Sequence, residues 1–221
     1  MTELCQMKLL LIAATEFEIL PIIKNEEAIA ETNKKFDILI TGVGLPATIY
    51  QLTKKLSEKK YDVVIQAGIA GSFSKKIKKG EVVFVKQDAF GDVGSNQKDT
   101  FKTLSEMGFE DANKFPFENG VLVNKSDITL ITKLTSVKGV TVNKITDQKK
   151  NIKQLRKKFD AEVESMEGAA LHYACLQQGV KFLQLRSISN YVGVRDKSKW
   201  KIKPAIENLN IELQRILNTI L

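Results

Sequence analysis

"KLLLIAAT" (residues 8–15) is an apolar run bounded by a lysine and a threonine. A strand with one solvated face alternates apolar and polar residues, whereas this run does not alternate, so it predicts a strand buried on both faces. Runs of the same kind recur along the chain, at 36–41, 61–68, 81–90, 137–145, 161–166 and 181–192. Segments with helical spacing lie at 45–60, 167–179 and 204–217. Strands that alternate with helices predict an α/β fold, in which helices cover both faces of a central sheet.

The 221 residues have an ordinary globular composition, 43% hydrophobic and 27% charged. We therefore expect one domain over residues 1–221. The two cysteines, Cys5 and Cys175, match no metal-binding or redox spacing, and the single histidine, His172, rules out a site with several histidines. We expect reduced thiols, no metal and no cofactor.

The net charge of +8 raises the question of a nucleic-acid partner. Lysine and arginine are scattered in short runs, and no RRM, helix-turn-helix or zinc-finger pattern accompanies them. A lysine-rich solvated surface is the simpler interpretation, and a general attraction for anionic small molecules is another. No apolar run approaches the ~18–20 residues of a membrane helix, and the first run lacks a basic leader. We expect no nucleic-acid partner, no membrane partner and a cytoplasmic location.

Two glycine-rich stretches follow neighbouring strands. "TGVGLPAT" (41–48) has the G-x-G-x-x-A spacing of a dinucleotide-binding turn, but the acid expected about 20 residues later, Asp62, lies at the wrong end of its strand. "AGIAGS" (67–72) predicts a second glycine turn at the next strand end. Each stretch alone is equally compatible with a tight connection. Because ligands of such sheets bind outside the carboxyl ends of the strands, we expect the two stretches to form one wall of a site, through Gly44, Ala70 and Gly71.

Two glutamates follow the first strand in "ATEFEI" (14–19). Thr15 and Glu18 are three residues apart, the spacing of a capping box, although Pro21 fits that interpretation poorly. A carboxylate at a strand end can also serve chemistry. We expect that one rotamer of Glu18 does not serve both roles, and that Glu16 is solvated or structural.

Two later strand ends carry further polar residues. In "VESMEGAA" (163–170), Glu167 is either an acid favoured by a helix dipole or a partner for two sugar hydroxyls, and Met166 packs either on a sugar or in the core. In "RSISNYVGVRD" (186–196), Asn190 is either a turn residue or an amide that reads a base. Local patterns leave these alternatives open.

Taken together, these motifs resemble the nucleoside phosphorylase and hydrolase superfamily, and within it the nucleosidase branch. "IAATEFEI" is similar to the segment that carries the water-activating glutamate of methylthioadenosine/S-adenosylhomocysteine nucleosidases, and "TGVG", "QAGIAGS" and "KKGEVVFV" follow in the expected order. "VESMEGAA" resembles their ribose-binding methionine–glutamate pair, and "FLQLRSISN" the strand that ends in the purine-contacting residue. The resemblance covers nearly the whole chain and is weakest over residues 95–135. It implies a three-layer α/β/α sandwich with a mixed, mostly parallel sheet, and a homo-oligomer, often a dimer.

The end of the last strand resembles one subgroup. Adenine-specific members end it in Ser-Asp, whereas this chain has Ser189-Asn190, and "SNYVGVRDKSKW" is similar to futalosine hydrolases of the menaquinone pathway. Hypoxanthine presents acceptors at N7 and O6, and an Asn amide has two N–H donors to serve them. A carboxylate that faced O6 would be repelled or left unpaired, at a cost of ~1–3 kcal/mol. Asn190 therefore favours a 6-oxopurine over a 6-aminopurine.

The resemblance implies hydrolysis of the N-glycosidic bond of futalosine. Glu18 would activate water, Glu167 and Met166 would hold the ribose, and Ser189 and Asn190 would contact the base. Asn190 would also stabilise negative charge on the leaving base, but unlike an aspartate it cannot deliver a proton.

The acidic "TEFE" (15–18) stands where the superfamily's phosphorylases place a phosphate-gripping arginine, so hydrolysis is favoured over phosphorolysis. Arg195, with Lys197 second, is the candidate partner for the carboxylate of futalosine. Two other functions stay open. One is a nucleosidase acting on methylthioadenosine, S-adenosylhomocysteine or aminofutalosine, and the other is a non-catalytic nucleoside-binding relative.

Overall fold

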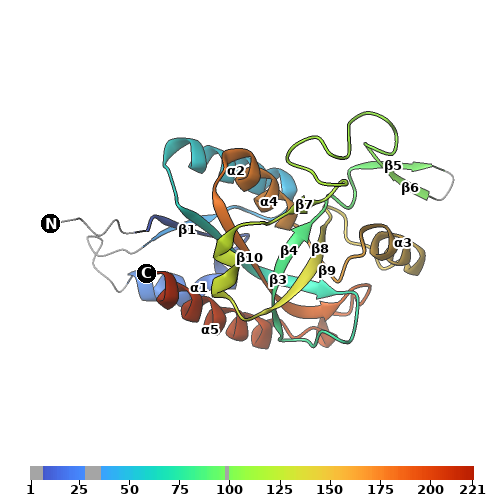
Figure 1. Ribbon diagram of the computed structural model, residues 1–221. Coiled ribbons are helices and arrows are strands. Elements are labelled where there is room, and N and C mark those ends of the chain that lie inside the picture. Colours follow the sequence, from blue (N-terminus) through green and yellow to red (C-terminus); the bar gives the residue numbers. More distant parts are fainter. Residues whose placement is uncertain (1–6, 28–35, 98–99) are drawn as a thin grey trace.

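The computed structural model describes residues 7–27, 36–97 and 100–221 (Figure 1). Its strands are β1 Leu9–Ala13, β2 Asp37–Ile40, β3 Val63–Ser72, β4 Val82–Asp88, β5 Gly94–Gln97, β6 Thr100–Thr103, β7 Leu122–Val123, β8 Thr135–Thr141, β9 Val163–Ser165 and β10 Lys181–Tyr191. Its helices are α1 Glu16–Glu27, α2 Leu45–Glu58, α3 Lys149–Phe159, α4 Gly168–Gln178 and α5 Ile202–Ile220, with short 3₁₀ helices η2 Asp127–Ile131 and η3 Lys197–Lys199. No helix within these ranges is long and apolar enough to cross a membrane. Cys5 lies outside the described residues.

Strand β3 is the centre of the sheet. It pairs in parallel with β1, and β2 extends the sheet beyond β1. It also pairs in parallel with β10 and antiparallel with β9, and the path from β10 through β4, β8 and β9 returns to β3. The sheet is therefore mixed and mostly parallel, as expected. The ring that part of it forms was not predicted, because no local pattern reports which strands are neighbours.

Helices cover both faces of the sheet (Figure 1). Helices α2 and α4 pack together on one face, and α1 and α5 pack together on the other. Successive side chains of a strand point to opposite faces, so Leu10 of β1 joins a buried cluster with Leu52 and Leu171, while Leu11 joins one with Leu209. Burial on both faces explains the unbroken apolar run in β1. The three-layer α/β/α sandwich is confirmed.

We predicted a turn for "AGIAGS" (67–72), and this prediction was wrong. The stretch is the second half of β3. Gly71 and Ser72 pair with β9 on one side and with β10 on the other. Cross-strand hydrogen bonds on both sides keep this glycine-rich segment extended. The wall that it forms is a strand end, which is more rigid than a loop.

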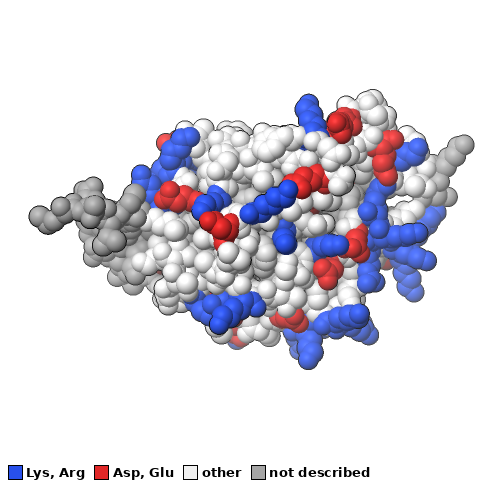
Figure 2. All heavy atoms as spheres, viewed as in Figure 1, with Lys and Arg blue, Asp and Glu red and all other residues white. Residues whose placement is uncertain are grey.

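Helix α3 was also not predicted, because its sequence is strongly basic and we interpreted the short basic runs of the chain as solvated surface. Its Leu155 and Phe159 nevertheless pack against Ala89 and Val140. Figure 2 shows lysine and arginine mixed with acidic residues over the visible face, and denser where α3 lies. The stretch before β8, where the resemblance is weakest, contains the β5–β6 hairpin, β7 and η2.

Candidate active site

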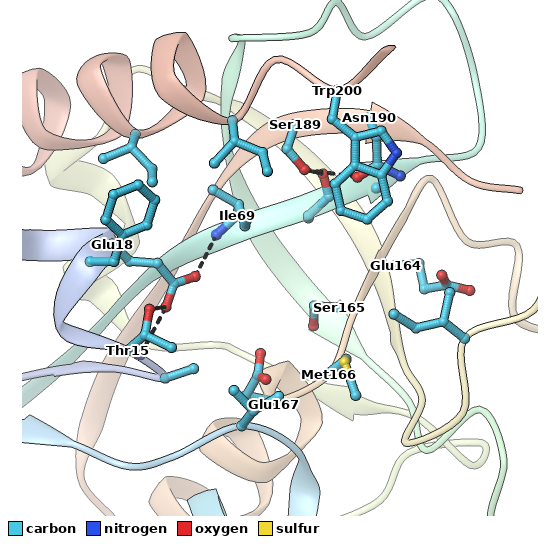
Figure 3. Close-up of a pocket in the computed structure, with 18 of the residues that line it drawn as sticks. Thr15, Glu18, Ile69, Glu164, Ser165, Met166, Glu167, Ser189, Asn190 and Trp200 are labelled. Carbon is cyan, nitrogen blue, oxygen red and sulfur yellow. Dashed lines mark hydrogen bonds between the residues drawn. The ribbon is translucent and has the colours of Figure 1, made fainter. Parts of the chain in front are cut away.

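A cavity of about 330 Å³ lies at the carboxyl ends of β1, β3 and β10, next to β9 (Figure 3). The strand topology brings the three polar clusters of the sequence together there, at the carboxyl ends of parallel strands, where we expected the site. Of the residues singled out from the sequence, those that line the cavity are Glu18, Ala70, Gly71, Met166, Glu167, Ser189, Asn190 and Arg195.

Glu18 lies in the first turn of α1 and is 7% exposed. Its Oε2 accepts hydrogen bonds from the N–H and hydroxyl of Thr15, at 3.1 and 3.2 Å, and its Oε1 accepts one from Ile69 N–H at 3.1 Å (Figure 3). One rotamer thus places one carboxylate oxygen on Thr15 and the other toward the cavity, so our expectation that a single rotamer could not serve both roles was wrong. Glu16 is exposed, as expected.

The pKa of the Glu18 carboxyl is raised, chiefly by burial. The positive charge of Arg186 and the N–H groups of Ile69 and Thr15 oppose that shift, and the charge of Glu167 reinforces it. A carboxylate with a raised pKa is a better proton acceptor than an exposed glutamate.

Glu167 immediately precedes α4 and is 6% exposed. Its side chain does not cap its own helix, because Ser165 and Thr141 hydroxyls accept the N–H groups of the first turn. Its Oε1 instead accepts the N–H of Gly44 at 3.1 Å. Gly44 does not line the cavity in this structure, so its observed contact is with Glu167.

Arg186, which was not among the predicted site residues, contacts Glu167 and acts on Glu18 through its charge. It is 1% exposed, its Nη1 lies 3.5 Å from Glu167 Oε2, and its Nη2 donates to Gln66 at 2.9 Å. A methyl group on Gly68 would overlap with Nη1 and lie 3.1 Å from Glu18 Oε1, so the glycine makes room for both side chains. The guanidinium therefore balances two buried carboxylates.

A β-bulge shapes the end of β10. Ile188 pairs with Ala70 and Asn190 with Gly71, so Ser189 is the extra residue. Neighbours on a regular strand point to opposite faces, but the bulge lets both Ser189 and Asn190 line the cavity.

The Asn190 amide is held in one orientation. Its Oδ1 accepts from the Ser189 hydroxyl at 2.8 Å, and its Nδ2 donates to the Tyr191 carbonyl at 3.1 Å. One Nδ2 hydrogen is therefore engaged, and the other is available to a ligand. We expected both amide hydrogens to contact the base, whereas in this conformation one of them is available.

Arg195 lies at the exposed rim of the cavity, with its guanidinium carbon 5.7 Å from the ring centroid of Trp200. Trp200 lines the cavity and donates to the Val194 carbonyl at 2.7 Å. Asp196 does not pair with Arg195, because it caps η3 through Ser198 and faces Lys199.

Three residues that line or support the cavity were not predicted. Two of them carry a feature in the sequence that could have identified them. Arg186 and Glu164 are charged residues inside otherwise apolar strands, which is unusual unless the charge is paired or functional. Trp200 had none, because it lies in a connection beyond β10. Lys197, the second candidate for a carboxylate partner, is exposed and does not line the cavity.

No cluster of three or more potential metal ligands occurs in the part of the chain that the structure describes. His172 is buried in α4 with Nδ1 3.1 Å from the Leu122 carbonyl, and burial lowers its pKa to about 4. The imidazole is therefore neutral near pH 7. His172 also does not line the cavity.

Comparisons with known proteins agree with this geometry. A family model described as the phosphorylase superfamily matches residues 28–221. A futalosine hydrolase of Streptomyces coelicolor is 31% identical over 79% of this chain and 75% of its own, and one of Thermus thermophilus is 28% identical over 82% and 81%. A 5'-methylthioadenosine/S-adenosylhomocysteine nucleosidase of Exiguobacterium is 29% identical over 72% and 68%.

The fold is also that of solved relatives. The structure of a futalosine hydrolase of Helicobacter pylori superposes with a TM-score of 0.80 over 97% of this chain and 98% of that one, at 16% identity. The chain therefore belongs to the phosphorylase superfamily, among its nucleosidases, which are N-glycosyl hydrolases.

Proposed function

We propose that the chain hydrolyses the N-glycosidic bond of futalosine, releasing hypoxanthine and dehypoxanthine futalosine in menaquinone biosynthesis. The observation that carries this proposal is that two buried carboxylates, Glu18 and Glu167, and an amide donor, Asn190, line one cavity. The relatives called futalosine hydrolase support the choice of substrate.

In the proposed reaction, water lies against Glu18 Oε1 and attacks the anomeric carbon. Glu18 takes a proton from that water, which its raised pKa favours. Glu167 accepts hydrogen bonds from ribose hydroxyls and fixes the sugar between the water and the base. The free N–H of Asn190 donates to an acceptor on the departing purine.

Water suits this pocket better than phosphate does. Glu18 and Glu167 both present carboxylate oxygens, and Arg186, the cation between them, is already engaged with Glu167 and Gln66. The test is to incubate the chain with futalosine, aminofutalosine, methylthioadenosine and inosine, each without phosphate, and to quantify free base. We expect futalosine to be cleaved fastest, and an absolute need for phosphate would refute hydrolysis.

Asn190→Asp should shift the preference toward 6-aminopurines. The Ser189 hydroxyl holds the oxygen of the present amide, so the pocket receives a donor, whereas an aspartate would offer an acceptor. We expect the ratio of kcat/KM for futalosine over aminofutalosine to fall about 10- to 100-fold. The matched control is Asn151→Asp, at an exposed position of α3. An unchanged ratio in Asn190→Asp would disprove the base-reading role.

Arg195→Ala should weaken binding of a substrate with a distal carboxylate. The guanidinium is exposed at the rim and has no salt bridge to any residue that the structure describes. We expect KM for futalosine to rise about 10-fold and KM for inosine to change little, since a charge-assisted hydrogen bond contributes about 1.5–3 kcal/mol. Lys197→Ala, outside the cavity, should leave both values alone. Equal effects of Arg195→Ala on both substrates would contradict the role.

The second candidate function is cleavage of methylthioadenosine or S-adenosylhomocysteine. The relatives of that name favour it, since their identities to this chain overlap with those of the futalosine hydrolases. The donor offered by Asn190 disfavours it, because a 6-amino group is itself a donor. The four-substrate incubation separates the two.

A further inference from the structure

The cavity contains a third buried carboxyl group, Glu164, that the proposed reaction has not used. Glu164 belongs to β9, is 7% exposed and lines the cavity. Its Oε2 is buried without a hydrogen-bond partner among the described residues. A buried carboxyl oxygen without a partner is costly unless the group is protonated or meets a ligand.

The strand register places Glu164 opposite Asn190. Glu164 pairs with Gly71 of β3, and Gly71 pairs on its other side with Asn190 of β10. Paired residues of neighbouring strands point their side chains to the same face. With strands about 4.8 Å apart, the Cα atoms of Glu164 and Asn190 are separated by roughly 10 Å.

Gly71 stands between Glu164 and Asn190 in the register, and because it has no side chain the Asn190 amide can lie close to it. A methyl group there would lie 3.3 Å from Asn190 Nδ2 and 3.1 Å from Val192 Cγ2. Figure 3 shows Glu164 at the Asn190 end of the cavity, away from Glu18, with Glu167 between the two ends. The base end of the proposed site is therefore flanked by an amide on one strand and a carboxyl group on another.

We infer that Glu164 is the acid that protonates the departing purine, a step that Asn190 cannot perform. This inference rests on the proposed function. The C1′–N9 bond breaks and its electron pair leaves with the base, while a ring nitrogen takes the proton of the Glu164 carboxyl. The oxygen of water forms the new bond to C1′, and Glu18 takes the proton from water. Solvent then returns a proton from Glu18 to Glu164, so the sum is the addition of one water.

The surroundings of Glu164 favour its acid form, so that a large share of it is still protonated near neutral pH. Burial raises the pKa of this carboxyl to about 7, against the opposing positive charge of Arg195 and with a contribution from Asp92. An acid must be protonated to act, so its contribution is complete below that pH and falls as the pH rises. The base Glu18 has the opposite requirement, and we therefore expect a bell-shaped pH profile.

The test compares kcat across pH 5–9 for the wild type, Glu164→Gln and Glu164→Asp, on whichever of the four nucleosides the wild type cleaves fastest. Glu164→Gln keeps the size but has no transferable proton, so we expect kcat to fall about 10²- to 10⁴-fold and the alkaline limb to disappear. Glu164→Asp keeps an acid one methylene further back, so we expect an intermediate kcat with the limb retained. Exposed Glu162→Gln, two residues earlier, is the control.

The pH profile of Arg195→Ala distinguishes an acid from a residue that is only structural, because a purely structural Glu164 would not shift the alkaline limb. Because the charge of Arg195 lowers the pKa of Glu164, its removal should shift the alkaline limb to higher pH. A Glu164→Gln variant that keeps either the wild-type kcat or the alkaline limb would overturn the inference. Failure of the proposed function looks different, because the wild type itself would then leave futalosine uncleaved or cleave another of the four nucleosides faster.

Discussion

Glu18→Gln should lower kcat by about 10²- to 10⁴-fold on the preferred nucleoside, with KM nearly unchanged. This carboxylate lines the cavity, its pKa is raised, and its Oε1 accepts a hydrogen bond from Ile69 N–H. An amide of the same shape cannot take a proton from water. Single-turnover release of free base, followed by chromatography, measures the effect.

Two controls separate chemistry from folding in that experiment. Glu16→Gln changes an exposed carboxylate two residues away and should leave kcat unaltered. Glu18→Gln keeps an oxygen for Thr15, so circular dichroism should report a folded protein. In a separate binding measurement, that protein should still bind hypoxanthine. Wild-type turnover in Glu18→Gln would remove Glu18 from the mechanism.

Arg186→Met should lower the free energy of unfolding by about 3–5 kcal/mol at pH 8, because it leaves buried carboxylates without their cation. Arg186 is 1% exposed and its Nη1 lies 3.5 Å from Glu167 Oε2. Arg215→Met, which breaks an exposed pair to Glu212, should cost less than about 1 kcal/mol. Urea unfolding of both variants and the wild type measures the difference.

The decrease in the free energy of unfolding caused by Arg186→Met should become smaller as the pH falls. Arg186 holds down the pKa of Glu18, which burial otherwise raises above the usual 4.5. Without Arg186 that folded-state pKa rises further, so the penalty for an ionised Glu18 is complete at high pH and is relieved when the carboxyl binds a proton. A loss as large at pH 5 as at pH 8 would show that packing, and not charge, is what Arg186 provides.

The functional residues could be predicted where chemistry coincided with a strand end. Glu18, Glu167 and Asn190 each follow an apolar run, so their position alone placed them at one edge of a sheet. Arg186 could not be assigned a partner, because its contacts are with Gln66 and Glu167, on two different strand–helix units. Likewise, the position of Glu164 across from Asn190 depends on the register of β9 on β3, which the sequence does not reveal.

The sequence by itself determined the α/β sandwich, since an unbroken apolar run such as "KLLLIAAT" is stable only between two layers of helices. It also determined which kinds of side chain end the strands. Only the tertiary structure decided that β3 would pair with β9 and β10 at once, that Gly71 would separate Glu164 from Asn190, and that Arg186 would lie beside two carboxylates. Periodicity reports how a segment is buried, whereas partners depend on long-range pairing, which no local pattern records.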